Sequence, residues 1–279
     1  MFLEERLDQL EAKVNSLESQ ISASTPVSTG KRKYGYRPDL PDQRDFLFED
    51  LGKKVVFPAH VDLRPLCSPV EDQGDLGSCT SHALAGALEF LEKKDKEILV
   101  RMSRLFIYYD ERALEGTVSS DSGANLRDGI KSLAKQGCCP ETEWPYLISK
   151  FTAKPPAKCY SDASAHIIQN YYRITTLNDM KTCLVAGFPF VLGFTVYESF
   201  ESDIVTRTGV VPMPAKHEQV LGGHAVLCVG FDDPTQRFIV RNSWGTAWGM
   251  QGYFTLPYAY VDNSKLASDM WYISKAKGL

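Results

Sequence analysis

Three short glycine-containing segments constrain the fold most, because their side chains can act together only if the fold brings them together. Residues 73–79 (QGDLGSC) end in Cys79, residues 222–225 (GGHA) carry His224, and residues 241–245 (RNSWG) carry Asn242. A thiol, an imidazole and an amide can form a nucleophile, its base and the group that orients the base. A buried cysteine alone is usually structural. The agreement of three separated segments favours the chemical interpretation.

Cys79 opens a segment with the pattern of a helix, residues 79–92. Its apolar side chains share one helical face: Ala83, Ala87, Phe90 and Leu91. A thiol in the first turn of a helix lies at the positive end of the helix dipole, and a nearby imidazolium would lower its pKa further. Gln73, six residues before Cys79, carries an amide that could form an oxyanion hole together with the N–H of Cys79.

His224 and Asn242 each belong to a strand-like run. Residues 223–231 are apolar and β-branched, which predicts a buried strand and a rigid support for His224. Residues 237–241 predict a second strand directly before Asn242. The Asn242 amide could accept the imidazole N–H and hold the ring toward the thiol, while Trp244 would shield that bond from water.

Residues 57–274 resemble the papain-like cysteine peptidases, on the three segments above and on further motifs, residues 61–64 (VDLR), 143–146 (EWPY) and 242–254. The resemblance implies that Cys79 is the nucleophile, His224 the general base and acid, Asn242 the orienting amide and Gln73 the oxyanion donor. No cofactor and no metal are expected.

The resemblance also implies an α+β fold, in which a helical lobe (about 79–150) and a β-barrel lobe (about 165–279) enclose a cleft. The residue pattern agrees with this order. Helices are expected at 103–115 and 124–135, and strands at 190–196, 225–231, 238–240 and 253–256.

Two departures from the family pattern place the chain off its main line. Leu76 and Thr80 stand where the family usually has a cysteine before the nucleophile and a tryptophan after it. The expected partner of that cysteine falls near Asp121, which is also not a cysteine. Both halves of one family disulfide are therefore absent together. The pattern is closest to a bacterial or large-virus branch of the xylellain type.

The same resemblance assigns the substrate cleft. Ser122, Gly123 and Ala124 match the cleft-edge strand that pairs with a peptide backbone. The family's specificity pocket takes the side chain two residues before the scissile bond. Its expected walls are Asn125, Leu126, Gly193 and Gly223, its floor lies within residues 266–270, and Trp244 is a further contact. The two glycines suggest a pocket for a large apolar or aromatic side chain, whereas an inward Asp269 would favour a basic one. Residues 116–160 carry no insertion with paired histidines, which favours endopeptidase activity.

The N-terminal region predicts two segments ahead of a peptidase domain at residues 55–279. Residues 1–23 carry a heptad pattern, which predicts a coiled-coil helix or a helix docked on its own protein. Residues 24–54 read as a linker and a pro-segment, of which residues 31–54 are expected to cover the active site, with processing near Lys53 and Lys54.

Charge and composition exclude other functions. A net charge of −4 without a basic stripe argues against nucleic-acid binding, and no apolar run reaches membrane-spanning length. The first residues are acidic rather than apolar, so no signal peptide is expected and the chain starts inside the cell, with export by another route left open.

Six cysteines remain beside Cys79. Cys183 and Cys228 lie in apolar runs and are expected to fill the core, and the role of Cys67 stays open. Cys138 or Cys139 could bridge to Cys159 in an oxidising compartment. A zinc site from these three with His166 is the alternative, although the spacing does not favour it.

The sequence therefore predicts a cysteine endopeptidase made as an N-terminally inhibited zymogen. Its partners would be peptide or protein substrates, its own N-terminal segment, and a second copy through residues 1–23. Two alternatives stay open: a catalytically silent binding protein assembled through the coil, and an acyl transferase that uses the same site.

Overall fold

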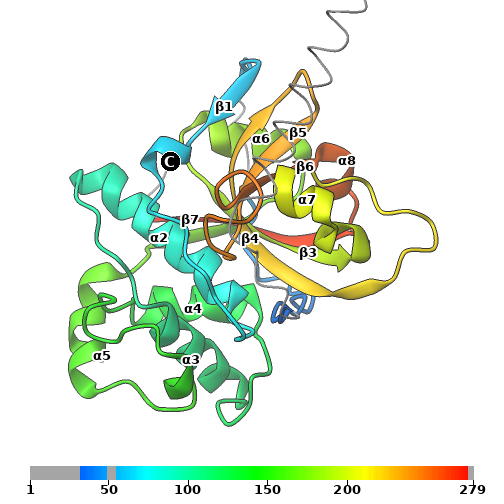
Figure 1. The fold of residues 1–279 in the computed structure, drawn as a ribbon. Coiled ribbons are helices and arrows are strands. Elements are labelled where there is room, and N and C mark those ends of the chain that lie inside the picture. The colour runs from blue at the N-terminus through cyan, green and yellow to red at the C-terminus, as the bar shows by residue number, and fades with distance from the viewer. Residues whose placement is uncertain (1–31, 49–54, 276–279) are drawn as a thin grey trace, which may run out of the picture. The chain divides into compact units, whose positions relative to one another are not determined.

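The computed structural model describes residues 32–48 and 55–275 as a helical lobe beside a sheet lobe (Figure 1). This is the predicted α+β arrangement with a helical half followed by a strand-rich half, and the fold prediction is confirmed. The heptad predicted at residues 1–23, the linker before residue 32 and the processing site near Lys53 lie outside the described residues.

Three helices build the first lobe: α2 (Cys79–Lys96), α3 (Arg104–Glu115) and α4 (Leu126–Lys135). The side chain of Ser103 accepts a hydrogen bond from the N–H of Phe106, which explains why α3 begins there. Apolar side chains of the three helices pack into one core, including Leu84, Phe106 and Ile130. The lobe also contains α5 (Ala157–Ala163) and short 3₁₀ turns at Arg64–Leu66, Ile148–Lys150 and Ser164–His166.

The second lobe is built on an antiparallel sheet with the strand order β2-β7-β3-β4-β5-β6, and β1 pairs with β4. The strands are β1 (His60–Asp62), β2 (Asn170–Arg173), β3 (Phe190–Tyr197), β4 (Val220–Asp232), β5 (Arg237–Arg241), β6 (Tyr253–Pro257) and β7 (Ala267–Ser274). Helices α6 (Leu177–Val185), α7 (Asp203–Thr208) and α8 (Tyr258–Val261) and a 3₁₀ turn at Glu198–Glu201 complete the lobe. Its core is strongly aromatic and contains Phe194, Phe200, Trp248 and Phe254.

Residues 32–48, called the cleft segment from here on, connect the two lobes by backbone pairing. Tyr36 forms a parallel bridge with Ala124, just before α4, and Leu47 forms one with Arg173 in β2. The segment therefore contacts both lobes, with a turn at residues 43–45 between its two bridges.

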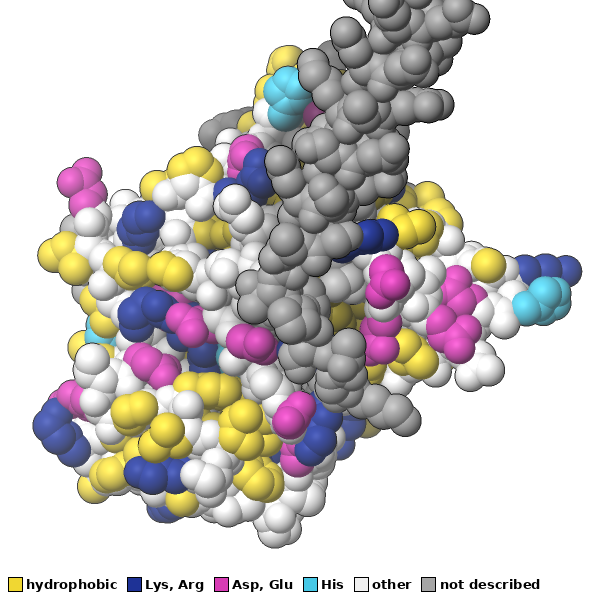
Figure 2. All heavy atoms as spheres, viewed as in Figure 1, with side chains coloured by type: hydrophobic (Ala, Val, Ile, Leu, Met, Phe, Trp, Pro, Cys, Tyr) yellow, Lys and Arg dark blue, Asp and Glu magenta, His cyan; other side chains and the backbone are white. Residues whose placement is uncertain are grey.

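The face drawn in Figure 2 carries acidic and basic side chains interspersed, without an area dominated by one sign. None of the helices within the described residues has the length and apolar character needed to cross a bilayer.

Candidate active site

The two lobes bring Cys79 and His224 to their interface. Cys79 is the first residue of α2, His224 lies in β4, and Asn242 directly follows β5. His224 Nε2 lies 2.8 Å from Asn242 Oδ1, so the amide oxygen accepts the ring N–H. The ring of Trp244 lies 5.1 Å from that of His224. The other ring nitrogen, Nδ1, is buried without a hydrogen-bond partner among the described residues.

Gln73 is fully buried and held from both ends of its amide. Its Oε1 accepts a hydrogen bond from Ser243 Oγ at 2.7 Å, which fixes the amide orientation. Its Nε2 donates to the carbonyl of Leu76 at 2.9 Å and to that of Lys33, in the cleft segment, at 3.3 Å. The amide N–H group is thus aimed at a carbonyl oxygen of a chain lying in the cleft.

Cys79 and His224 are both completely buried under the cleft segment. Burial raises the pKa of the Cys79 thiol to about 11, although the backbone at Ala225 and Gly35 counteracts part of that shift. Burial also lowers the pKa of His224 to about 4, against the hydrogen bond to Asn242. In this state the pair is therefore a neutral thiol and a neutral imidazole.

Both edges of the cleft pair with the backbone of the cleft segment. The N–H of Ala124 donates to Gly35 at 2.7 Å, and its carbonyl accepts from the N–H of Arg37 at 3.0 Å. On the opposite edge, the carbonyl of Gly223 accepts from the N–H of Tyr36 at 3.1 Å. Gly35 itself leaves no room for a side chain, because a Cβ there would lie 1.7 Å from the carbonyl oxygen of Gly77.

The Tyr36 side chain fills a pocket beside Gly193, Gly223 and Ser268. A Cβ on Gly193 would lie 1.9 Å from the Tyr36 ring, so only glycine fits beside it. The Tyr36 hydroxyl lies 2.6 Å from Ser268 Oγ and donates to Asp269 Oδ2 at 2.5 Å. Asp269 thus points toward the occupant of the pocket. A further cavity of about 370 Å³ continues beside the tyrosine.

The remaining residues expected at the cleft lie at different depths. Asn125 does not reach the Tyr36 hydroxyl, and its amide donates to the carbonyls of Arg37 and Pro38. Leu126 is fully buried in the core of the helical lobe. Ser122 bonds to Thr117 and to the carbonyl of Gly123 behind the cleft edge.

Two acidic residues at the site, Asp121 and Glu111, were not predicted to be functional from the sequence. Asp121 accepts hydrogen bonds from the N–H of Gly77, at 3.0 and 3.2 Å, and from the Tyr108 hydroxyl at 2.5 Å. Glu111 is buried and accepts a hydrogen bond from the hydroxyl of Thr80 at 2.6 Å. Burial raises the pKa of Glu111 to about 8. The sequence drew attention to Asp121, since the expected partner of the missing cysteine falls near it, whereas no sequence signal singled out Glu111.

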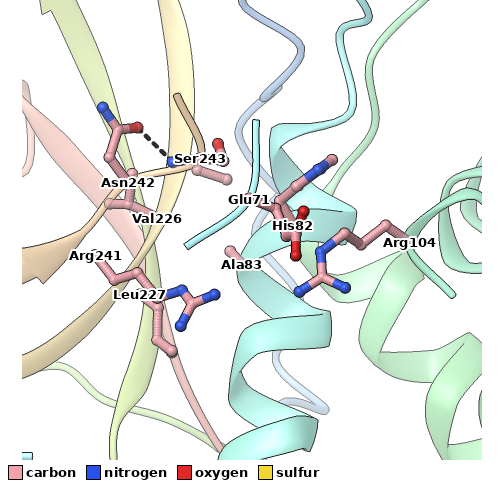
Figure 3. A pocket seen from close by; sticks show the side chains of 10 residues that line it. Glu71, His82, Ala83, Arg104, Val226, Leu227, Arg241, Asn242 and Ser243 are labelled. Atoms are coloured by element: carbon pink, nitrogen blue, oxygen red, sulfur yellow. Dashed lines mark hydrogen bonds between the residues drawn. The ribbon is translucent and has the colours of Figure 1, made fainter. Parts of the chain in front are cut away.

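A small cavity of about 10 Å³ lies between the lobes behind Asn242, and Figure 3 shows its lining. Glu71, His82 and Arg104 face the sheet residues Arg241 and Leu227 across it. This volume suits about one water molecule. The interface behind the site is therefore closely packed.

All seven cysteines are thiols in this structure. Cys183 and Cys228 are buried in the sheet lobe, and Cys139 and Cys159 are buried in the core of the helical lobe, where burial raises the pKa of Cys139. His166 is bonded to Glu92 at 2.7 Å. Within residues 32–48 and 55–275, His, Cys, Asp and Glu side chains form no group that could hold a metal ion.

A buried thiol at the start of α2 and a buried imidazole bonded to an amide, in a fold of two lobes, are the features expected of a thiol hydrolase. The profile of the papain family cysteine proteases matches residues 57–274, and the chain belongs to this family of cysteine peptidases.

Two similar proteins cover nearly the whole chain. An uncharacterised peptidase C1-like protein of Acanthamoeba polyphaga mimivirus is 43% identical over 276 residues, 89% of this chain and 89% of that protein. The crystal structure of xylellain, a cysteine protease from Xylella fastidiosa, matches with a TM-score of 0.83 and 44% identity, over 88% of this chain and 98% of that one. The predicted likeness to a bacterial and large-virus branch is confirmed.

A cathepsin B-like protein of Giardia intestinalis, CP3, is 29% identical over 214 residues. The match covers 69% of this chain and 65% of that longer protein.

Proposed function

We propose that the chain is a cysteine endopeptidase that the cleft segment keeps inactive until it is displaced. The observation that carries this proposal is the position of the cleft segment in the cleft. It pairs with Ala124 and Gly223 on the two cleft edges and lies over the buried Cys79 beside the His224–Asn242 hydrogen bond.

In the proposed mechanism, His224 Nδ1 takes the proton of the Cys79 thiol, and the thiolate sulfur attacks the carbonyl carbon of the scissile peptide bond. Asn242 accepts the N–H at Nε2, which leaves Nδ1, the nitrogen without a partner, to face the thiol. His224 then protonates the leaving amine, and an acyl-enzyme remains. A water molecule, deprotonated by His224, hydrolyses the acyl-enzyme and releases Cys79.

Gln73 supports this mechanism as the oxyanion donor. Its Nε2 already donates to the carbonyl of Lys33, which stands in for the carbonyl oxygen of a substrate. The bond from Ser243 holds the amide so that its N–H groups, rather than its oxygen, face the cleft.

The direction of the cleft segment explains why it would inhibit rather than be cut. Tyr36 pairs with Ala124 in parallel. The family's pocket takes the residue two positions before the scissile bond, so a substrate with its side chain in the Tyr36 pocket continues toward Cys79 at its carboxyl side. The cleft segment continues toward Cys79 at its amino side, through Gly35. The backbone carbonyls of the segment therefore pass Cys79 in the order opposite to those of a substrate.

The segment also passes Cys79 on both sides, with Tyr34 near His224 and Trp244 on one side and Tyr36 in its pocket on the other. A cleft that holds an extended chain on both sides of the nucleophile suits cleavage inside a polypeptide, and the proposal is therefore an endopeptidase.

The test uses the full chain with a recognition sequence for a site-specific protease in place of residues 49–54. After folding, the protein is treated with an epoxide inhibitor of papain-like enzymes and with a fluorogenic peptide, before and after the cut and removal of the cleft segment. Adduct formation and hydrolysis are expected only after the cut, and neither is expected in Cys79→Ala. Absence of an adduct in both forms would refute the enzyme mechanism, and equal hydrolysis in both would refute the inhibition.

A further inference from the structure

Beyond the Tyr36 pocket, the cleft segment rests on two arginines of the body. Asp45 accepts hydrogen bonds from Arg127 Nε and Nη2 at 3.1 and 2.6 Å, and from Arg173 Nε at 2.9 Å. The carbonyl of Leu40 accepts a bond from Arg127 Nη1 at 2.7 Å. Within the described residues, all hydrogen bonds of the Arg127 guanidinium go to the cleft segment, under which Arg127 is 7% exposed. Departure of the segment removes all of these partners at once.

Asp39 of the segment occupies a site with three hydrogen-bond donors. Its Oδ1 accepts from the N–H of Arg127, in the first turn of α4, at 3.1 Å. Its Oδ2 accepts from Arg173 Nη2 and from Trp271 Nε1, both at 3.0 Å. The guanidinium of Arg173 lies 4.3 Å from the Trp271 ring and is packed against it. These donors come from α4, β2 and β7 of the body, so they remain when the segment leaves.

The net charge of the acidic and basic side chains at this site changes sign when the cleft segment leaves. With the segment in place, the carboxylates of Asp39, Asp45 and Asp269 face the guanidiniums of Arg127 and Arg173. When the segment is gone, Asp269 is the one of these three carboxylates that remains, and it is bonded to Arg173 Nη1 at 2.7 Å. One carboxylate supplied by a ligand would then, together with Asp269, balance the two guanidiniums. Burial and Asp269 raise the pKa of the Asp39 carboxyl at this site to about 6, and the hydrogen bonds from Trp271 and from the N–H of Arg127 oppose that rise, so the carboxylate form prevails at neutral pH.

The site lies on the path that a bound peptide follows. Asp39 is three residues from Tyr36, and the chain between them is held extended by Ala124 and Asn125, a span of about 10 Å. A substrate runs in the opposite direction, so its residue at this site precedes the pocket residue by three positions. That residue is the fifth before the scissile bond.

We propose that the opened cleft contains a carboxylate-recognition site, formed by Arg173, Trp271 Nε1 and the N–H of Arg127 with the Arg127 guanidinium beside it. It selects peptide substrates with an acidic residue three positions before the residue that enters the Tyr36 pocket. The inference rests on the proposed endopeptidase function, and the cleft segment occupies the site by presenting Asp39 in the reverse chain direction.

The test compares two internally quenched peptides that are identical except for Asp or Asn at the fifth position before the scissile bond, with Tyr three residues later. The enzyme is the full chain, cut within residues 49–54 after folding and freed of the cleft segment. In the wild type, kcat/KM for the Asp peptide is expected to exceed that for the Asn peptide about tenfold, the scale of one hydrogen bond to a charged group.

Arg173→Gln is expected to bring the ratio close to one, and Arg127→Gln to lower it in part. The second variant keeps the Asp269–Arg173 pair and so covers the case in which the first does not fold. The matched control is Arg207→Gln, an exposed arginine on α7, which should leave the ratio unchanged.

Equal hydrolysis of both peptides by the wild type would overturn the inference and leave the proposed function standing. If neither peptide is hydrolysed, the proposed function fails, and binding of the same two peptides to the cut Cys79→Ala protein decides the inference separately. Equal affinity there would overturn it, and tighter binding of the Asp peptide, lost in Arg173→Gln or weakened in Arg127→Gln, would support it.

Discussion

Replacing Tyr36 by alanine tests how strongly the cleft segment holds the site closed. Tyr36 is 5% exposed, its ring fills the space left by Gly193, and its hydroxyl bonds to Ser268 and Asp269. Truncation of a buried aromatic side chain typically costs about 3–5 kcal/mol. The backbone bonds of the segment remain, and water can enter the emptied pocket, so we expect about 2–3 kcal/mol less favourable closure.

The opening equilibrium should rise by the corresponding factor, roughly 30- to 150-fold, because each 1.4 kcal/mol changes an equilibrium constant tenfold. When opening is fast relative to the chemical step, the rate of Cys79 alkylation follows this equilibrium. The assay is the rate at which a thiol reagent modifies the Cys79-containing peptide of the uncut chain, followed by mass spectrometry. Tyr36→Phe, which keeps the ring and loses the bonds to Ser268 and Asp269, should give a smaller increase of about tenfold.

The matched control is Phe46→Ala, which removes an aromatic side chain from the same segment. Phe46 is 68% exposed, and exposed substitutions usually change stability by less than about 0.5 kcal/mol, so its alkylation rate should stay within about threefold of the wild type. If Tyr36→Ala and Phe46→Ala label Cys79 equally fast, the Tyr36 pocket does not hold the segment and the reasoning is wrong.

Two further substitutions test the acidic residues behind the site. Asp121→Ala leaves the N–H of Gly77 without its acceptor, so we expect about 1–3 kcal/mol lower unfolding free energy in urea and slower Cys79 alkylation after the cut, with smaller losses in Asp121→Asn. Equal stability of Asp121→Ala and wild type would contradict this. Because burial raises the pKa of Glu111 to about 8, the folded chain keeps a proton that the unfolded chain releases, and this stabilisation is complete below about pH 4.5 and lost as the pH rises to about 8. In Glu111→Gln that fall should disappear from urea unfolding curves between pH 5 and 8, and an unchanged slope would show that Glu111 is ionised in the fold.

Elements with a strong local pattern could be predicted from the sequence. The helix was expected to begin at Cys79, and α2 (Cys79–Lys96) begins there. The strand run at residues 225–231 lies inside β4, and the run at 238–240 lies inside β5. In these segments apolar periodicity and burial agree, so the prediction needed no knowledge of distant partners.

The ion cluster under the cleft segment could not be predicted in this way. Arg127, Arg173 and Asp269 belong to α4, β2 and β7, and no short-range pattern relates them. Asp269 has a positive φ of 58°, a conformation that its neighbours do not indicate. The sequence predicts that residues 31–54 cover the active site, but the residue that enters the pocket depends on which positions without a Cβ, Gly193 among them, face the cleft.

The departures from the family pattern compensate for one another within the fold. The resemblance implies that the missing disulfide would have linked the loop before the nucleophile to the cleft edge, between Leu76 and a position near Asp121. Leu76 is buried, and the Asp121 carboxylate bonds to the N–H of Gly77, two residues before Cys79. The loop is thus held by burial and by a charge-assisted hydrogen bond, neither of which requires oxidation.

Lys33 of the cleft segment extends the same connection. Its ammonium group lies 3.0 Å from Asp121, and its carbonyl accepts the bond from Gln73 Nε2. The cleft segment therefore contacts both the residue that positions the nucleophile loop and the proposed oxyanion donor. Removing the segment frees Gln73 for a substrate carbonyl while Asp121 keeps its bond to Gly77, so the loop can stay in place when the cleft opens.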